Sequence, residues 1–535
     1  MYCCKRSFAP LFTAAVVIAT AIAALRIANI DARAQAGAII DVPAGGNLQQ
    51  ALNSIQPGGT IRLAPGATYT GSFTLPAKNG SDYILITTRD AVLPPPGQRI
   101  DPGYKGGLAT IKSSSTSSAL RTAAGASYYR IRGVAFEANQ NGSGDIIAIG
   151  HADYTSESQV PHHIELDQVL ISGSETVGQK RGIAANGSFV AITNSDIREI
   201  KAAGQDAQAI AAWNTPGPIT IRNNYLEAAG ENILFGGAHV SIPGAVPSDI
   251  VVEDNMLTKN PAWVGSKWTV KNIFELKSAR RVLVRRNIMQ YNWGGSQPGY
   301  AIVFTPRNSS GKTPWVVVED VEFSGNILSH SGGGFNLLGH DDTDPSGQLA
   351  RVLIKNNLVF DVGSTWKGSG VFAQIGGEPR DITIDHNTIL HDGNVITFYR
   401  GQYPNSSGVM VAGGPVLGFV FTNNLMKHNA YGIFGSGQAY GNGTLAYYAP
   451  GAVVQRNVFA ADSSLASRYP ADNAFPTVAA FTAQFLNPAM FDYRLVAGSQ
   501  FRNAGTDGLD LGCNFALQQS VTRPTAPTGL RITGQ

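Results

Sequence analysis

The 535-residue sequence has few cysteines, and this limits its covalent cross-links. Of its three cysteines, Cys3 and Cys4 lie in the N-terminal segment, and only Cys513 remains in the rest of the chain. A single thiol cannot form an internal disulfide, so cysteine usage gives no sign of an oxidising compartment. Cys513 is expected to pack as a small apolar side chain.

Charged residues are also scarce, at 14% of the sequence. Residues 1–34 hold four of the 40 basic residues and one of the 37 acidic ones, which leaves 36 of each in the rest of the chain. A net charge near zero gives no bulk positive surface, so we expect no nucleic-acid partner.

Long apolar runs are absent after residue 25. Before it, Lys5 and Arg6 precede an apolar stretch from Phe8 to Leu25, and Ala32-Arg33-Ala34 follows as a cleavage site. This order is typical of a signal peptide, predicted at 1–34, and a retained membrane anchor is the alternative. The sequence therefore predicts a secreted or periplasmic protein that has no membrane contact after cleavage, and we expect a monomer.

The sequence is rich in glycine, with 61 residues, and an amphipathic helix pattern covers Asn47 to Ile55. A strand pattern, Thr60-Ile-Arg-Leu, follows a Gly-Gly stop. A helix that precedes a series of strands can cover the open end of a solenoid. We therefore assign residues 35–128 to an N-terminal cap and first coils.

A short motif recurs from about residue 129: two apolar residues two apart, two polar residues, an asparagine and a further apolar residue. Its clear members are ITIRNNYL at 219–226, IVVEDNML at 250–257, VLVRRNIM at 282–289, VEFSGNIL at 321–328, VLIKNNLV at 352–359, ITIDHNTI at 382–389, FVFTNNLM at 419–426 and AVVQRNVF at 452–459. Weaker members start at residues 129, 163 and 190. The asparagines are Asn194, Asn224, Asn255, Asn287, Asn326, Asn357, Asn387, Asn424 and Asn457, separated by 30 to 39 residues.

Alternation with a period of two inside each motif indicates strands. A unit of roughly thirty residues is too short for a propeller blade and suits one coil of a parallel β-helix. Asparagine tolerates a left-handed turn, and its amide can bond to the same amide in the next coil, about 4.8 Å away. The sequence therefore predicts an all-β solenoid of about eleven coils over 129–480, closing strands at 481–520, and a linker or tail at 521–535.

A second strand pattern precedes each corner, as in ENILFGG at 231–237, NIFELK at 272–277 and YAIVFTPRN at 300–308. The helix-then-strand opening and the repeated asparagine corners resemble the right-handed parallel β-helix proteins of the pectate lyase superfamily. The resemblance implies a right-handed, single-stranded parallel β-helix, a pectin lyase-like solenoid. This fold carries lyases, hydrolases and non-catalytic proteins.

Three short segments resemble the chondroitinase B and alginate lyase family of polysaccharide lyases. They are Gly230 to Gly236, then Leu276-Lys277-Ser278, then Ser296-Gln297 through Arg307. The resemblance implies that Lys277 is the base and that Arg307 protonates the leaving oxygen or neutralises the uronate. The family's acidic calcium ligands are altered here to Asn272 and Glu275, so a Ca²⁺ requirement stays open and no cofactor is assigned.

β-Elimination removes the weakly acidic C5 proton of a uronate, and cations beside the carboxylate stabilise the charge that develops. A lysine becomes a base when nearby positive charge lowers its pKa. We therefore hypothesise an acidic polysaccharide as the partner, and the expected substrate-binding residues are Glu231, Glu275, Arg281, Asn308, His340 and Trp293.

Other interpretations stay open at this point. Lys277 could belong to a solvated turn, and Arg307 could pair with an acid such as Glu275. Asp341 and Asp342 could be the carboxylate pair of a glycoside hydrolase. A third hypothesis is a non-catalytic carbohydrate-binding or surface protein.

Overall fold

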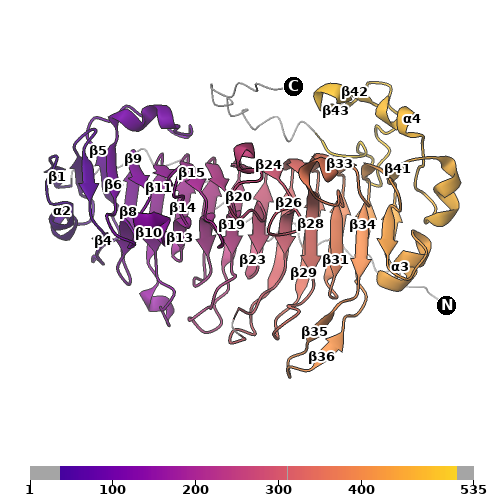
Figure 1. Cartoon of the computed structure of the whole chain (residues 1–535), viewed down its shortest axis with the longest axis horizontal. Helices are drawn as coiled ribbons and strands as arrows, with labels where there is room; N and C mark the ends of the chain where they lie inside the picture. Colours follow the sequence, from indigo (N-terminus) through magenta and orange to yellow (C-terminus); the bar gives the residue numbers. More distant parts are fainter. Residues whose placement is uncertain (1–36, 310, 515–535) are drawn as a thin grey trace, which may run out of the picture.

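The computed structural model describes residues 37–309 and 311–514, and it shows a right-handed parallel β-helix (Figure 1). Three long parallel sheets of 14, 13 and 12 strands form its sides, and they are called the first, second and third sheet below. The coils lie side by side along the long axis of the molecule (Figure 1). The predicted signal peptide at 1–34 and the tail at 521–535 lie outside the described residues.

The first sheet contains every copy of the repeated motif. Its strands are β1 (Ile39–Val42), β2 (Thr60–Leu63), β5 (Ile84–Thr88), β8 (Ser127–Arg132), β11 (His162–Asp167), β14 (Ser188–Thr193), β17 (Ile219–Arg222), β20 (Ser248–Glu253), β23 (Ala279–Arg285), β26 (Val318–Ser324), β29 (Leu349–Lys355), β32 (Arg380–Asp385), β37 (Val420–Thr422) and β40 (Val453–Gln455). The eleven motif copies correspond to β8 through β40. Strands β1, β2 and β5 precede them, within the residues predicted to form the N-terminal cap and first coils, so the first sheet has 14 strands and the solenoid has more coils than the predicted eleven.

The second and third sheets complete each coil. The second sheet consists of β3 (Thr68–Thr70), β6 (Ala109–Lys112), β9 (Val134–Glu137), β12 (Leu170–Ser172), β15 (Asp196–Ile200), β18 (Tyr225–Ala228), β21 (Met256–Thr258), β24 (Ile288–Asn292), β27 (Ile327–Ser331), β30 (Leu358–Val362), β33 (Thr388–His391), β38 (Leu425–Lys427) and β41 (Val458–Ala460). The third sheet consists of β4 (Phe73–Leu75), β7 (Leu120–Thr122), β10 (Asp145–Ile149), β13 (Arg181–Ala185), β16 (Gln208–Ala212), β19 (Glu231–Phe235), β22 (Phe274–Leu276), β25 (Tyr300–Phe304), β28 (Gly333–Leu338), β31 (Ala373–Gly376), β34 (Ile396–Tyr399) and β39 (Ile433–Gly435).

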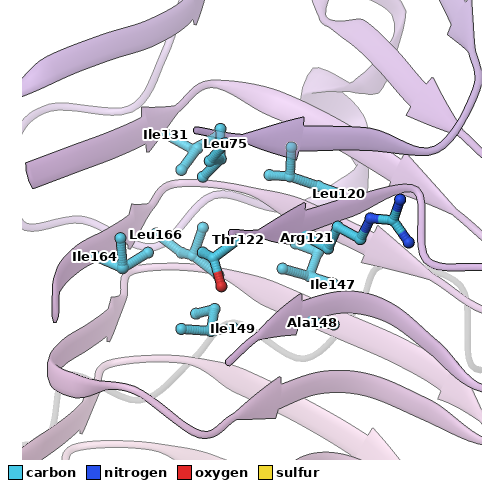
Figure 2. Close-up of a pocket in the computed structure, with 10 residues that line it drawn as sticks. All are labelled: Leu75, Leu120, Arg121, Thr122, Ile131, Ile147, Ala148, Ile149, Ile164 and Leu166. Atoms are coloured by element: carbon cyan, nitrogen blue, oxygen red, sulfur yellow. The ribbon is translucent and has the colours of Figure 1, made fainter. Parts of the chain in front are cut away.

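Alternate side chains of each strand fill the interior. Figure 2 shows this in the early coils, where Leu75, Ile131 and Ile147 point inward and the guanidinium of Arg121 points away from them. Six alternate residues of β19, β22 and β25 are fully buried: Ile233, Phe235, Phe274, Leu276, Ile302 and Phe304. Each such side chain contributes about 1.5–3 kcal/mol relative to its exposed state.

Eight of the nine motif asparagines form a continuous ladder between the first and second sheets. From Asn224 to Asn457, each Nδ2 donates to the Oδ1 of the next asparagine, at 2.9–3.2 Å, and Asn473 extends the ladder by one step. Each backbone N–H also donates to that same Oδ1, as Asn326 does to Asn357. The ladder therefore satisfies buried amides that would otherwise be costly.

The structure corrects two details of the prediction that the motif asparagines form the corners. Asn194 does not belong to the ladder, because Ser195 occupies the equivalent position and donates its backbone N–H to Asn224 Oδ1. The left-handed conformation belongs to the residue before each ladder asparagine, as in Asn223 (φ 52°) and Arg286 (φ 54°). Asn194 has this conformation itself, with φ of 53°.

Short helices and hairpins cover the ends. The predicted N-terminal helix is α2 (Leu48–Ser54), and the Asn47 side chain caps it by accepting from the backbone of Gln50. Helices α3 (Asn442–Tyr448) and α4 (Val478–Thr482) and the hairpin of β42 (Phe485–Asn487) with β43 (Asp492–Leu495) lie at the other end (Figure 1). Cys513 is buried in the apolar cluster there, as predicted. No helix among the described residues is long and apolar enough to cross a membrane.

Candidate active site

Lys277 and Arg307 lie on adjacent coils at one edge of the third sheet. Lys277 directly follows β22, and Arg307 comes shortly after β25, the next strand in that sheet. The backbone N–H of Arg307 donates to the carbonyl of Lys277 at 2.9 Å. Their side chains are 18% and 29% exposed. The structure therefore brings the two predicted residues together, and both side chains are partly accessible.

Two glycines in the preceding coil make room for Lys277. Gly236 and Gly237 have φ of 85° and 77°. A Cβ on Gly236 would lie 2.4 Å from the backbone nitrogen of Ser278, and one on Gly237 would lie 2.9 Å from Cδ of Lys277. The Gly-Gly pair after β19 thus allows the close approach that positions the lysine.

Two buried carboxyl groups lie beside Lys277. Glu275 is 2% exposed, and its Oε1 is 3.4 Å from Nζ of Lys277. Burial, with a smaller contribution from the neighbouring Glu231, raises the pKa of Glu275 to about 7 against the opposing charges of Lys277 and Lys271. Glu231 Oε1 and Glu275 Oε2 are both buried without a hydrogen bond, although the ammonium of Lys271 lies 3.2 Å from Glu231 Oε1. A proton shared between the two carboxyl groups would satisfy both of these oxygens.

Two further lysines surround this pair. Lys271 Nζ is 3.2 Å from Glu231 Oε1 and donates to Asp206 Oδ2 at 2.8 Å. Burial alone would lower the pKa of Lys271, but Glu231 and Asp206 outweigh burial and raise it. Lys259 is completely buried and donates to four backbone carbonyls, including those of Gly230 (2.6 Å) and Asn272 (2.7 Å). Burial lowers the pKa of Lys259 to about 7.

A line of polar side chains continues from Glu231 toward the N-terminal coils. Glu231 Oε2 accepts from Gln208 at 2.9 Å, and Gln208 Oε1 accepts from Arg181 at 3.0 Å. Arg181 also pairs with Asp145 at 2.7 Å and lies over the ring of Trp213. A chain of polar contacts and one aromatic ring therefore extends across several coils on this side of the solenoid.

Arg307 pairs with the two aspartates proposed as a hydrolase pair, and not with Glu275. Nη1 of Arg307 donates to Asp341 Oδ1 at 2.9 Å and also to Asp342. Asp341 is buried, and its Oδ2 accepts from the backbone of Asn308 at 2.7 Å. Both aspartates therefore bind the same nitrogen of Arg307 and are engaged in an ion pair with it.

Asn308 has a structural role in the loop that follows Arg307. It is 1% exposed, its Nδ2 donates to the carbonyl of Pro345, and its Oδ1 accepts from the backbone of Thr313. Its amide is therefore fully engaged within the protein. The expectation that Asn308 contacts substrate does not agree with these contacts.

His340 lies further along the same side of the solenoid. Its ring stacks on Tyr403 at 4.1 Å, and burial lowers the pKa of His340. Tyr403 lies on β35 (Gln402–Pro404), which forms a hairpin with β36 (Met410–Ala412), and its hydroxyl donates to Glu378 at 3.0 Å. The hairpin projects from the coils at the edge where the other loops of this side emerge (Figure 1).

Two expected substrate-binding residues lie elsewhere. Arg281 is on β23 of the first sheet, beyond the corner from Lys277, and forms a bidentate pair with Asp249 at 2.7 and 2.8 Å. Trp293 is 3% exposed and packs in a cluster with Trp263 and Val270. Its ring therefore has no free face for a sugar.

The site contains residues that sequence reasoning missed or left without a role. Lys259, Asp206 and Gln208 were not connected to Glu231, because they come from different coils with loops of different length. The only sequence signal for these three residues was the segment that contains Glu231, because it identifies the coil around which they lie. Tyr399 is also close enough to Asp342 and Arg307 for their charges to act on its hydroxyl, although burial is the main reason its pKa rises to about 12.

The residues do not fit the Ca²⁺ ion that the family resemblance leaves open. Ca²⁺ takes about six to eight oxygen ligands. Here Glu231 Oε1 faces the ammonium of Lys271, and Glu275 Oε1 faces that of Lys277. Only Glu275 Oε2 and Asn272 Oδ1 remain without a partner in this group. Within residues 37–309 and 311–514, no group of three His, Cys, Asp or Glu side chains could hold a metal.

Comparison with known proteins finds similarity in structure and none in sequence. No protein-family model and no curated protein matches the chain. A mannuronic acid specific polysaccharide family 6 lyase from human gut microbiota matches with a TM-score of 0.53 and 12% identity, over 83% of this chain and 93% of that one. The family 6 alginate lyase AlyGC matches with a TM-score of 0.52 and 16% identity, over 82% of this chain and 53% of that one. The chain is therefore a right-handed parallel β-helix protein, and it has this fold in common with these polysaccharide lyases.

Proposed function

We propose that the chain is an exported polysaccharide lyase that cleaves a uronate-containing polysaccharide by β-elimination. The observation that carries the proposal is the adjacency of Lys277 and Arg307, joined by a backbone hydrogen bond across two coils and both partly exposed. The fold shared with a mannuronic acid specific polysaccharide lyase and with an alginate lyase supports the same class of reaction. Alginate is therefore the first substrate to test.

Each residue has a defined part in this reaction. As the base, Lys277 takes the C5 proton with its Nζ, the electron pair forms the C4–C5 double bond, the C4–O bond breaks, and the departing oxygen takes a proton from solvent water. Negative charge develops on the uronate carboxylate, where a guanidinium stabilises it. Both contacts of Arg307 with aspartates use Nη1, so Nη2 and Nε are left to bind that carboxylate.

Product analysis distinguishes this reaction from the alternatives. The purified chain is incubated with alginate, pectate and glycosaminoglycans. Elimination gives an unsaturated end that absorbs ultraviolet light, hydrolysis gives reducing ends without that absorbance, and a binding protein gives no new ends. We expect the first outcome with at least one of these polymers, and either of the others would contradict the proposal.

Replacing the base tests the site itself. Lys277→Ala should lower kcat by about 10²–10⁴-fold, because general-base catalysis contributes that much. The matched control is Lys267→Ala, because Lys267 is an exposed lysine that donates to a backbone carbonyl away from Lys277. Retention of full activity by Lys277→Ala would show that another group removes the proton.

A further inference from the structure

Glu231 and Glu275 form a buried carboxyl pair, and their oxygens do not form the exposed ligand set that a metal ion needs. We propose that the ammonium group of Lys271 is the built-in counter-ion of this pair and takes the place of a divalent metal. In this role Lys271 is a positioning residue, because it acts on Lys277 through the carboxyl groups. The catalytic part of this inference rests on the proposed function, and the metal-binding part does not.

The contacts of Lys271 leave its ammonium group little freedom. Nζ is bound between Glu231 Oε1 at 3.2 Å and Asp206 Oδ2 at 2.8 Å, and the side chain is 14% exposed. The backbone N–H of Lys271 donates to the carbonyl of Ala229, one coil earlier. The side chain thus leaves its backbone directly beside the start of β19, where Glu231 lies.

A metal ion at the same place would compete with this group. An ion bound to Glu231 Oε1 would share that oxygen with an ammonium 3.2 Å away and meet strong repulsion. The other oxygen, Glu231 Oε2, already accepts from Gln208. The ammonium of Lys271 already supplies a positive charge to the pair, so the carboxyl groups have a counter-ion without a metal.

The effect of Lys271 reaches the proposed base through a short chain of contacts. Lys271 fixes Glu231, Glu231 neighbours Glu275, and Glu275 Oε1 is 3.4 Å from Lys277 Nζ. Lys259 holds the backbone of the same corner, at Gly230 and Asn272, from the interior. A small movement of the carboxyl pair would therefore change the direction of the Lys277 amine.

The first test measures metal binding by the native chain. Purified protein treated with a chelator is titrated with Ca²⁺ by calorimetry and with Tb³⁺ by luminescence. We expect no stoichiometric binding of either ion at this site. Binding of one ion per chain that is lost in Glu231→Gln would overturn the proposal, whether or not the protein has lyase activity.

The second test changes the counter-ion. Lys271→Gly removes the ammonium and leaves space beside two carboxyl groups, so Tb³⁺ should bind to this variant and not to the native chain. Lys271→Arg keeps the charge and should bind no Tb³⁺. Lys267→Gly is the control from the same loop and should behave like the native chain. Equal Tb³⁺ binding by Lys271→Gly and the native chain, or binding by neither, would contradict the inference.

Kinetics then separate positioning from folding. We expect Lys271→Gly to lower kcat by roughly 10- to 100-fold with a smaller change in KM, as for other residues that orient a catalytic group. Lys271→Arg, or Ca²⁺ added to Lys271→Gly, should restore part of that loss. A variant that keeps the native circular dichroism spectrum and native kcat would overturn the positioning role. If no polysaccharide is cleaved at all, the proposed function fails and the metal-binding result still decides this inference.

Discussion

At the scale of single residues, Arg307 has the contacts that most restrict its role. Its Nη1 is held by Asp341 and Asp342, so the guanidinium is already oriented before substrate binds. A preorganised guanidinium can present its remaining donors to a carboxylate in a fixed geometry. The two aspartates therefore act as positioning groups for Arg307 in the proposed mechanism.

Replacing Arg307 by lysine keeps the charge and removes this geometry. We expect Arg307→Lys to lower kcat/KM on the cleaved polysaccharide by roughly 10- to 100-fold, because a bidentate contact to the uronate is lost. Arg281→Lys, on the first sheet and paired with Asp249, is the matched control and should have native kinetics. Equal activity in the two variants would mean that Arg307 does not contact the substrate.

Glu275 should make stability depend on pH. Its folded-state pKa, about 7, lies above the ordinary value of 4.5, so its contribution is fully present below about pH 4.5 and is lost as pH rises through 7. The loss amounts to about 3 kcal/mol at pH 8. Glu275→Gln should therefore flatten the dependence of the free energy of unfolding on pH between 5 and 8, as measured by denaturant titration.

The comparison for this experiment is Glu157→Gln, a change to an exposed carboxylate in a surface turn. It should leave the pH dependence unchanged. If Glu275→Gln has the native slope as well, the carboxyl group titrates at its ordinary pH and the cluster is less desolvated than the structure indicates.

At the scale of elements, the asparagine ladder connects consecutive coils. Asn326 illustrates its contribution: its Oδ1 accepts from the backbone and side chain of Asn287, and its Nδ2 donates to Asn357 and to Val284. All three asparagines are almost completely buried. Removing one amide therefore leaves several buried groups unpaired at once.

We expect Asn326→Ala to lower the free energy of unfolding by about 2–4 kcal/mol, because each unpaired buried group costs about 1–3 kcal/mol. Asn53→Ala on α2 is the control, since that side chain is exposed. Denaturant unfolding of both variants gives the comparison. A change below 1 kcal/mol for Asn326→Ala would show that water replaces the amide in the ladder.

The elements also show why the sequence predicted the fold so well. In each motif the alternation of apolar and polar residues indicates a strand, and the asparagine indicates the corner that follows it. All eleven copies lie on the first sheet. The shift between Asn194 and Ser195 escaped prediction, because a serine can take the ladder position without matching the motif.

The candidate site was only partly predictable. Lys277 and Arg307 follow neighbouring strands of the third sheet, so their adjacency follows from the repeat. Trp293 and Arg281 were misplaced, because closeness in sequence does not reveal on which side of a corner a side chain lies. The pairing of Lys271 with Asp206 joins residues 65 apart, and no pattern in the sequence indicates it.

At the scale of the whole molecule, protonation of one buried histidine should lower the free energy of unfolding. His391 is 1% exposed, and burial lowers its pKa to about 3, with Lys427 adding to the shift. The stability it provides is present above its ordinary pKa of 6.5 and is lost as pH falls toward 3. By pH 4 this amounts to about 3 kcal/mol.

We therefore expect the native chain to lose more stability between pH 7 and pH 4 than His391→Gln does. The midpoint of denaturant unfolding at the two pH values measures this difference. His151→Gln is the control, since His151 is 62% exposed in its side chain. If all three proteins lose the same stability in acid, other groups drive acid unfolding.

The stacking of coils places residues from distant parts of the sequence on one wall, and the proposed activity depends on this. The direct test is the rate at which native protein and Lys277→Ala form unsaturated ends from alginate, with both proteins shown to be folded by circular dichroism. We expect ultraviolet-absorbing product from the native protein and almost none from the variant. Equal rates, or polymer cleavage without that absorbance, would contradict it.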